Sequence, residues 1–178
     1  MFRNTVSVDK PKIEVEISSV KRLPKEFIEQ FTNEVRYRYN LDLELHDFYK
    51  RFSNDKFVGP VIKKMRGMRP GHQDSLYEYL IIGIVLQNCT VRRSIQMMQV
   101  LFEKYGMLLE FAGKKLWCFW EPGNLKNVTE EELRSLKLGY RAKFIKRIDE
   151  QFAKGEVSET KLRTQSMEEQ KTNLLKLY

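Results

Sequence analysis

The sequence predicts a mostly α-helical fold, a helical bundle that carries a small β element at its N-terminus. Apolar residues recur at helical spacing from about residue 24 onward, whereas apolar and polar residues alternate before residue 20. The chain has 178 residues and 42% of them are hydrophobic, which is enough for one domain with a substantial core. We therefore expect a short β element over residues 1–22 and a helical domain over residues 23–178.

The β element is predicted from the alternation of Ile13, Val15 and Ile17 with polar neighbours, a pattern typical of a half-buried strand. Residues 5–8 are the candidate partner strand. A turn at residues 9–11, Asp-Lys-Pro, would join the two strands.

The first helices are expected between residues 24 and 66. Pro24 suits the first turn of a helix, and apolar residues then recur at helical spacing. A dense apolar group at residues 41–52 predicts a second short helix. We expect the Gly-Pro pair at residues 59–60 to break the chain before a further helical turn at residues 61–66.

Two longer helices follow. Ser75 and Glu78 form a capping-box pair before the apolar residues 76–86, and Thr90 can cap the next helix. We expect Gly106 to end that helix. Its apolar face would contain Val91, Ile95, Met98, Leu101, Phe102 and Tyr105. The aromatic residues 117–120 are then expected in a helix-to-helix connection that closes at Pro122-Gly123.

The last helices are predicted from Thr129, which precedes three glutamates, and from the Ser166/Glu169 capping-box pair. Between them a break at residues 138–141 precedes a helix that ends at Gly155. Its apolar face would contain Ala142, Ile145, Ile148 and Phe152. The final helix is apolar to its last residue and has no capping glycine. Either it frays, or a continuation of the chain or a second chain completes its packing.

Charge and composition restrict the classes of partner. The formal net charge of +8 favours a polyanion, with nucleic acid ahead of an anionic membrane surface. Two cysteines and two histidines indicate neither a disulfide framework nor a zinc site, so we expect no metal and no cofactor. Residues 1–12 lack the apolar core of a signal peptide, and the apolar run at residues 79–86 is far shorter than the about 20 residues of a membrane span. We expect an intracellular protein, cytoplasmic and nucleoid-associated or nuclear, with no membrane partner.

The most informative stretch is "LQNCTVRR", in which Gln87 and Asn88 occupy the break between two helices. Arg92 and Arg93 follow in the first helical turn, where the helix dipole disfavours positive charge. A phosphate or a base edge could select them, because guanidinium offers a planar fork of donors. Spacing alone, however, favours a capped turn with solvated arginines.

A second break has the same construction, with Gly139, Tyr140 and Arg141 before a helix. A tyrosine at a loop tip can stack on bases or wedge between them, although it can equally pack into the core beneath the turn. Helix N-termini also bind phosphates through free N–H groups. With the positive charge, two such tips predict an edge that faces DNA.

These segments resemble the helix–hairpin–helix superfamily of DNA glycosylases. The resemblance covers roughly residues 40–178 and is carried by residues 66–69, residues 76–80, "IIGIVLQNCTVRRSIQMMQVLFEKYG" and "EELRSLKLGYRAKFIKRI". It is strongest to the 8-oxoguanine glycosylases and the alkylated-base (3-methyladenine) glycosylases, and "LDLELHDFY" resembles the second group. The resemblance implies that residues 1–22 are a remnant of an N-terminal β-sheet domain.

The resemblance also implies roles for single residues. Asn88 matches the asparagine that fills the gap left by a flipped nucleotide, and Tyr140 matches the neighbouring wedge. Arg93 and Arg141 match arginines that read the orphaned cytosine, which favours the oxidised-guanine branch. Gln87 and Arg92 flank these positions and are expected to contact the same DNA. A flipped base leaves a hole in the stack, and filling it offsets an unstacking cost of a few kcal/mol.

The hairpin with the catalytic lysine and aspartate of this superfamily would begin where the sequence ends, at residues 174–178. We therefore assign no catalytic residue, and we expect a helical domain that is incomplete at its C-terminus. The implied function is DNA base-excision repair, with two partners: duplex DNA that contains a damaged base and a separate C-terminal half. The alternatives are a non-catalytic helical DNA-binding or assembly module and a protein-interaction module that uses the apolar last helix.

Overall fold

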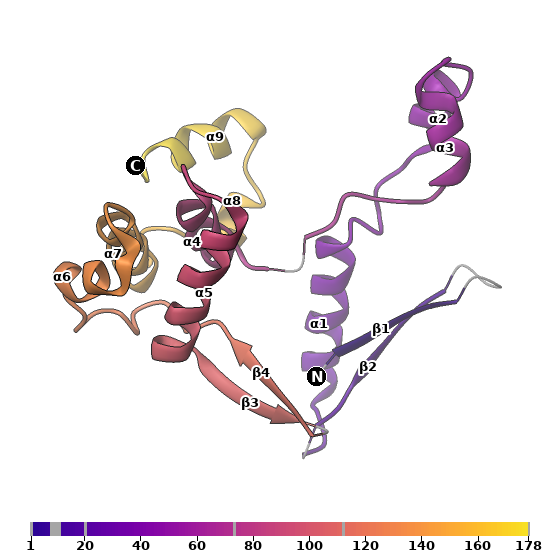
Figure 1. Cartoon of the computed structure of the whole chain (residues 1–178). Helices are drawn as coiled ribbons and strands as arrows, with labels where there is room; N and C mark the ends of the chain where they lie inside the picture. The colour runs from indigo at the N-terminus through magenta and orange to yellow at the C-terminus, as the bar shows by residue number, and fades with distance from the viewer. Residues whose placement is uncertain (1, 8–11, 20, 73, 112, 178) are drawn as a thin grey trace. The chain divides into compact units, whose positions relative to one another are not determined.

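A computed structural model describes residues 2–7, 12–19, 21–72, 74–111 and 113–177. Packing divides the chain into two compact units, Met1–Gln73 and Asp74–Tyr178, each with its own elements (Figure 1). The predominance of helix confirms the predicted fold class. The predicted boundary between residues 22 and 23 separates a β element from helices and stays a prediction, since compactness divides the chain at residues 73 and 74.

The first unit opens with an antiparallel strand pair, β1 (Phe2–Ser7) and β2 (Lys12–Ile17). The register runs from Phe2 opposite Ile17 to Ser7 opposite Lys12. The predicted strand at residues 13–17 is therefore present, and its partner starts three residues earlier than expected. The predicted turn at residues 9–11 lies outside the described residues.

Three helices complete the first unit: α1 (Lys25–Arg38), α2 (His46–Phe52) and α3 (Val58–Lys64). The Gly-Pro pair expected to break the chain lies inside the first turn of α3 instead. Pro60 is tolerated there because the N–H groups of the first turn have no partner within the helix. A side chain on Gly59 would have its Cβ 2.4 Å from the Ser53 carbonyl oxygen, so α2 and α3 approach too closely for any other residue.

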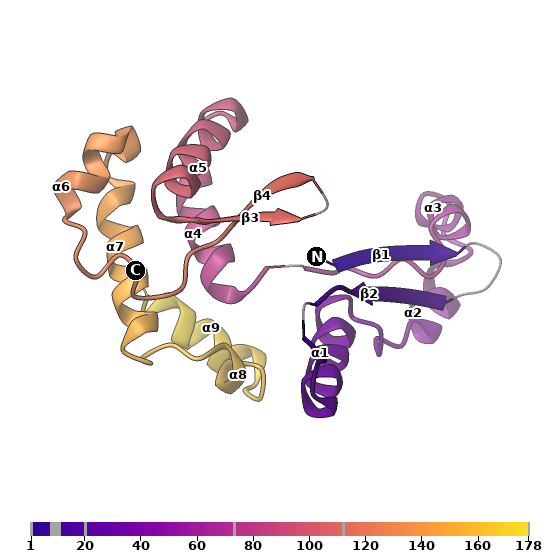
Figure 2. The same cartoon turned by 90° about the horizontal axis from the view of Figure 1, so that it is seen from below.

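The second unit is built on α4 (Leu76–Leu86), which packs against both α5 (Val91–Tyr105) and α7 (Arg141–Ala153) (Figure 2). Shorter elements surround them: α6 (Glu130–Leu133), the π-helical turn η1 (Arg134–Leu138), α8 (Glu159–Leu162) and α9 (Met167–Leu175). The core consists of fully buried side chains from these helices, among them Ile81, Ile84, Met97, Leu101, Leu133, Leu138, Ile145 and Ile148.

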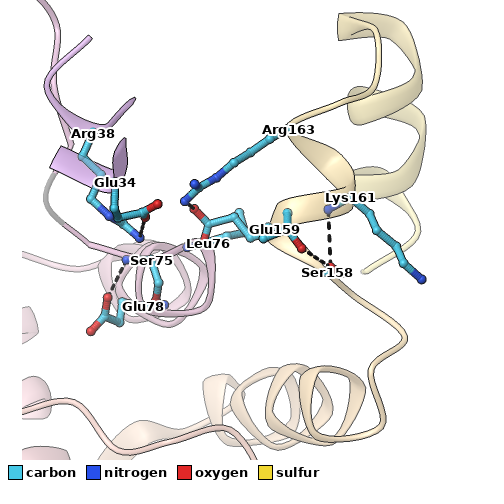
Figure 3. A network of polar contacts seen from close by, with 10 residues as sticks. Glu34, Arg38, Ser75, Leu76, Glu78, Ser158, Glu159, Lys161 and Arg163 are labelled. Atoms are coloured by element: carbon cyan, nitrogen blue, oxygen red, sulfur yellow. Dashed lines mark hydrogen bonds and ion pairs between the residues drawn. The ribbon is translucent and has the colours of Figure 1, made fainter. Parts of the chain in front are cut away.

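The predicted caps are confirmed. Ser75 and Glu78 form both hydrogen bonds of a capping box at α4, and Ser166 and Glu169 do the same at α9. A second carboxylate also serves α4, because Glu159 of α8 accepts a 2.8 Å hydrogen bond from the Leu76 backbone N–H (Figure 3). These contacts satisfy N–H groups that have no partner within the helix.

The predicted face of α5 is wrong in its first turns. Val91 and Ile95 are 71% and 61% exposed, whereas Ser94 and Met97, which were not predicted, are buried; Leu101 is buried as predicted. Ser94 tolerates burial because its hydroxyl bonds to the Thr90 carbonyl and lies 3.1 Å from the Cys89 sulfur. An apolar periodicity does not reveal a buried position that a small, internally bonded serine occupies.

A β-hairpin, β3 (Met107–Phe111) and β4 (Lys114–Cys118), stands where a helix-to-helix connection was predicted. Side chains on both faces of the hairpin are exposed, so its sequence lacks the one-sided alternation that identifies a half-buried strand. Gly106 follows the last residue of α5, as predicted. Only glycine fits at this position, because a Cβ there would lie 2.6 Å from the Phe102 carbonyl oxygen and 2.8 Å from that of Cys118. Of the predicted aromatic cluster, Trp117 is exposed on β4 and Trp120 is buried in the core.

Candidate nucleic-acid interface

The first predicted tip, residues 87–93, joins α4 to α5. Gln87 caps α4, and Asn88 follows with φ +47°, a left-handed conformation that asparagine adopts more readily than most residues. The Thr90 hydroxyl then accepts a 3.3 Å hydrogen bond from the Arg93 backbone N–H and begins α5. Asn88 therefore stands at the apex of the turn with its side chain exposed.

The second predicted tip, residues 137–141, joins η1 to α7. Lys137 and Gly139 both have positive φ, +62° and +61°, which reverses the chain within three residues. Tyr140 is the N-cap of α7 and is 42% exposed. The turn η1 is kinked at Lys137, whose φ and ψ are not helical.

Three hydrogen bonds bring the two tips together. The Asn88 side-chain amide donates to the Tyr140 hydroxyl at 3.2 Å. The Arg93 guanidinium donates to the Lys137 carbonyl oxygen at 2.7 Å. In the opposite direction, the Arg141 guanidinium donates to the Gln87 carbonyl oxygen. Each arginine thus binds the backbone of the other tip.

This reciprocity gives a physical reason for arginines in first helical turns. The carbonyl oxygens of Gln87 and Lys137 lie at the C-terminal ends of α4 and η1, where carbonyls lack helical partners and the dipole is negative. Each arginine is unfavourably placed for its own helix and favourably placed for the end of the neighbouring one. The contacts stabilise the paired tips before any ligand is present.

The six predicted residues differ in accessibility. Asn88, Arg92 and Tyr140 are exposed, and Gln87 and Arg93 are half-buried. Arg141 is only 8% exposed; its guanidinium lies 4.9 Å from the centre of the Tyr140 ring and donates to the Leu138 carbonyl oxygen at 3.5 Å. The structure therefore brings Asn88, Arg93, Tyr140 and Arg141 together at one edge and leaves Arg92 exposed on α5.

The Tyr140 ring is held from two sides. Arg141 covers it, and the Phe144 ring meets it edge-on with centroids 6.4 Å apart and an interplanar angle of 84°. Its exposure excludes the alternative that Tyr140 is packed into the core. The edge thus presents a fixed aromatic ring beside a side-chain amide.

The two tip segments themselves carry charge of one sign, although Arg134 is ion-paired with Glu130 at 2.6 Å. Segments 84–93 and 134–144 contain six basic residues and no acidic one. The basic residues are Arg92, Arg93, Arg134, Lys137, Arg141 and Lys143. Such a surface attracts a polyanion.

A buried polar network, which the sequence did not predict, fixes the far ends of the same helices. The Asp149 carboxylate is fully buried and accepts hydrogen bonds from the Tyr77 hydroxyl (2.7 Å) and from the backbone N–H of Gly123 (3.0 Å) and Leu125 (3.2 Å). The Tyr77 hydroxyl in turn accepts from the Trp120 indole at 2.7 Å. Burial and the neighbouring Asp149 raise the pKa of Tyr77, so its hydroxyl remains a donor.

The network and the tips together determine how α4 lies on α7. Tyr77 is in the first turn of α4 and Asp149 is late in α7, whereas Gln87 ends α4 and Arg141 begins α7. The two helices are therefore antiparallel, with polar contacts at both ends. The signal available in the sequence was an aspartate next to Ile148 on the apolar face of α7.

Over the described part of the chain, no group of three His, Cys, Asp or Glu side chains could hold a metal ion. In that same part, every helix is too short or too polar to cross a membrane.

Known protein-family profiles do not match this chain. Two curated proteins do. It is 25% identical over 150 residues to the DNA-3-methyladenine glycosylase of Bacillus subtilis (strain 168), an alignment that covers 84% of this chain and 50% of that protein. It is 26% identical over 131 residues to the probable N-glycosylase/DNA lyase of Methanothermobacter thermautotrophicus, covering 63% and 42%. The chain thus spans about half the length of the curated relatives it matches.

Solved structures share the fold. The structure of MBOgg1 in complex with a low-affinity DNA ligand matches with a TM-score of 0.72 and 22% identity, covering 98% of this chain and 57% of that one. The apo 8-oxoguanine glycosylase/lyase of Clostridium acetobutylicum matches with a TM-score of 0.68 and 24% identity, covering 84% and 52%. The 3-methyladenine DNA-glycosylase of Archaeoglobus fulgidus matches with a TM-score of 0.68 and 18% identity, covering 94% and 59%.

Proposed function

We propose that this chain, which is related to the helix–hairpin–helix DNA glycosylases, forms the DNA-reading part of a base-excision-repair glycosylase. It would bind damaged duplex DNA, fill the gap left by a flipped base and read the orphaned base. The observation that carries the proposal is the set of hydrogen bonds that pairs Asn88 with Tyr140 at an exposed edge. The basic surface around that edge supports it.

The wedge would consist of Asn88 and Tyr140. When a base leaves the stack, its neighbours lose stacking energy and a polar edge loses its partner. Aromatic stacking on a base contributes about 1–3 kcal/mol, and the Tyr140 ring is already held in place by Arg141 and Phe144. The Asn88 amide would meet the polar edge of the orphaned base.

The arginines would read that base. A guanidinium has five donors, and Arg93 is half-buried with one terminal nitrogen on the Lys137 carbonyl and the other 3.4 Å from the Gln96 side-chain oxygen. Arg93 can therefore turn one terminal nitrogen toward a cytosine edge by giving up its 3.4 Å contact with Gln96. Arg141 would have to release the Gln87 carbonyl first, so we assign it the positioning of the tips in the free protein and base reading only after they part.

The full reaction would need more than this chain. We assign no catalytic residue here, and we propose that a separate C-terminal half supplies the catalytic hairpin and most of the lesion pocket. The substrate would be 8-oxoguanine or an alkylated purine in cellular DNA, in the cytoplasm or the nucleus. Purified chain that excises 8-oxoguanine opposite cytosine unaided would disprove the need for a second half.

The test is binding to four fluorescent duplexes that carry an abasic-site analogue opposite cytosine, adenine, guanine or thymine, beside an intact duplex. We expect tighter binding to the gapped duplexes, and tightest binding when cytosine faces the gap. Arg93→Ala should remove the cytosine preference, a loss of about 1–3 kcal/mol. The matched control Arg92→Ala, on the exposed side of the same turn, should weaken binding to all five duplexes equally.

Equal affinity for intact and gapped duplexes would refute the wedge. Gap-selective binding without excision, even in the presence of a complementing C-terminal half, would instead favour a non-catalytic DNA-binding module.

A further inference from the structure

A second feature of the surface lies in the first unit, over residues 46–69, which contain α2, α3 and the turn that follows; we call it the α2–α3 surface. It contains seven lysines and arginines and two aspartates, which gives it a formal net charge of +5. The formal net charge of the whole chain is +8. The basic residues are Lys50, Arg51, Lys56, Lys63, Lys64, Arg66 and Arg69, all exposed except the half-buried Arg69.

Of the two aspartates, Asp55 is engaged within the chain. Its carboxylate accepts 2.8 Å hydrogen bonds from the backbone N–H of Phe57 and of Val58 at the start of α3. These hydrogen bonds lower the pKa of Asp55. With seven basic residues against two aspartates, the charge that this surface offers to a partner is predominantly positive.

An apolar pocket of about 290 Å³ opens in this basic surface. Its walls are almost entirely aliphatic or aromatic and include Phe48, Val58, Val61, Ile62, Met65 and Met68. Several of these side chains are exposed, and Met68 is 61% exposed. Exposed apolar side chains gathered around a concavity and rimmed by polar ones mark an interaction site.

Three aromatic rings of this surface each lie beside a cation. A cation already covers one face of each of three rings: Arg51 lies 5.4 Å from the centre of Phe52, Lys56 lies 5.8 Å from Phe57, and Arg66 lies 4.9 Å from Tyr49. These cations place positive charge beside the apolar side chains, which favours an acidic partner. The pocket is also at the small end of the range for ligand sites, about 300–1,000 Å³, which suits one large side chain better than a nucleotide.

We propose that the α2–α3 surface binds an acidic amphipathic segment of a partner protein, with one apolar side chain of that segment in the pocket. Two methionines in the walls suit such a site, because their flexible thioethers adapt to different apolar side chains. The basic rim supplies the charge complementarity that steers an acidic segment and rejects a basic one. Such binding corresponds to the recognition of an amphipathic helix by an apolar groove. The proposal does not depend on the proposed DNA-reading function.

The experiment measures fluorescence anisotropy with the full chain and two labelled 14-residue helical peptides. Both carry leucines along one face; the remaining positions are glutamate in one peptide and lysine in the other. We expect the glutamate peptide to bind at least tenfold more tightly, and Val61→Asp to weaken it at least tenfold. Lys63→Glu with Lys64→Glu should weaken it several-fold at low salt.

The matched control is Lys154→Glu with Lys171→Glu, which changes the net charge equally on exposed positions of the second unit and should leave binding within twofold. Circular dichroism monitors folding, and Met68→Glu provides a second pocket variant should Val61→Asp unfold.

Three results would each overturn the proposal. The first is equal binding of the two peptides. The second is a single-stranded oligonucleotide that binds in a manner sensitive to Val61→Asp. The third is a homodimer that Val61→Asp converts to a monomer, because the occupant would then be a second copy of the chain.

Discussion

Replacing Asp149 by alanine should destabilise the second unit severely. The substitution leaves three buried donors without their acceptor: the Tyr77 hydroxyl and the backbone N–H groups of Gly123 and Leu125. Each unsatisfied buried donor costs about 1–3 kcal/mol. Because water can enter the space that the carboxylate vacates, we expect a loss near the low end of the sum, about 4 kcal/mol.

Urea denaturation followed by tryptophan fluorescence measures this loss, since the buried Trp120 belongs to the same network. With a slope of about 2 kcal/mol per molar urea, the midpoint should fall by about 2 M. Asp149→Asn keeps one acceptor oxygen and should cost roughly half as much. Lys143→Ala, on the exposed face of the same helix, is the control and should change the free energy of unfolding by less than about 0.5 kcal/mol.

A loss below about 1 kcal/mol for Asp149→Ala would show that the three donors find other partners. The network would then not be what fixes α4 on α7.

Further substitutions test other parts of the second unit. Arg141→Lys should lower stability by about 1–3 kcal/mol in urea melts, because one ammonium cannot reach the carbonyls of both Gln87 and Leu138; an unchanged midpoint would contradict the bracing role. Gly106→Ala should cost about 1–3 kcal/mol in the same assay through overlap with backbone oxygens that cannot move aside, and a neutral effect would mean that the hairpin shifts freely. A hydrogen bond from Lys104 lowers the pKa of Glu132, so this carboxylate contributes stability above its ordinary pKa of 4.5 that is lost as the pH falls through the lowered value. Melts from pH 6 to pH 3 should show that loss, and Glu132→Gln should remove this part of it, whereas identical profiles would exclude the linkage.

The sequence predicted those features whose physical cause is local. The capping boxes at Ser75 and Ser166 depend on residues three positions apart, and the structure contains both. The core face of α7 follows from helical spacing, and Ala142, Ile145 and Ile148 are all buried. Such features involve neighbours along the chain, so a pattern of residue types is enough to reveal them.

Features that depend on distant residues were missed. The β3–β4 hairpin has exposed side chains on both faces, so no alternation distinguished it from a connection. The buried Asp149 is stabilised by donors 24 to 72 positions away, and no local pattern predicts their arrival. Burial without those partners would be prohibitively costly, which is why a sequence pattern alone assigns an aspartate to the surface.

The candidate edge is an intermediate case. The two breaks and their arginines were visible as a repeated construction, and the resemblance to glycosylases implied that they act together. The proximity of Asn88 and Tyr140 was not derivable from spacing, because 52 positions separate them. Nor was the burial of Arg141, since its partner is a backbone oxygen on another element.

The acceptors of the two tip arginines are main-chain oxygens, and this leaves the side chains at positions 87 and 137 unconstrained by the contacts. Every amino acid supplies the same carbonyl, so position 87 can be varied while the frame that holds the edge persists, whereas the φ of +62° at Lys137 restricts that position to residues that tolerate a left-handed backbone. A library varied at Gln87 would therefore explore new contacts on a constant scaffold. The same fold could diversify what it recognises at little cost in stability.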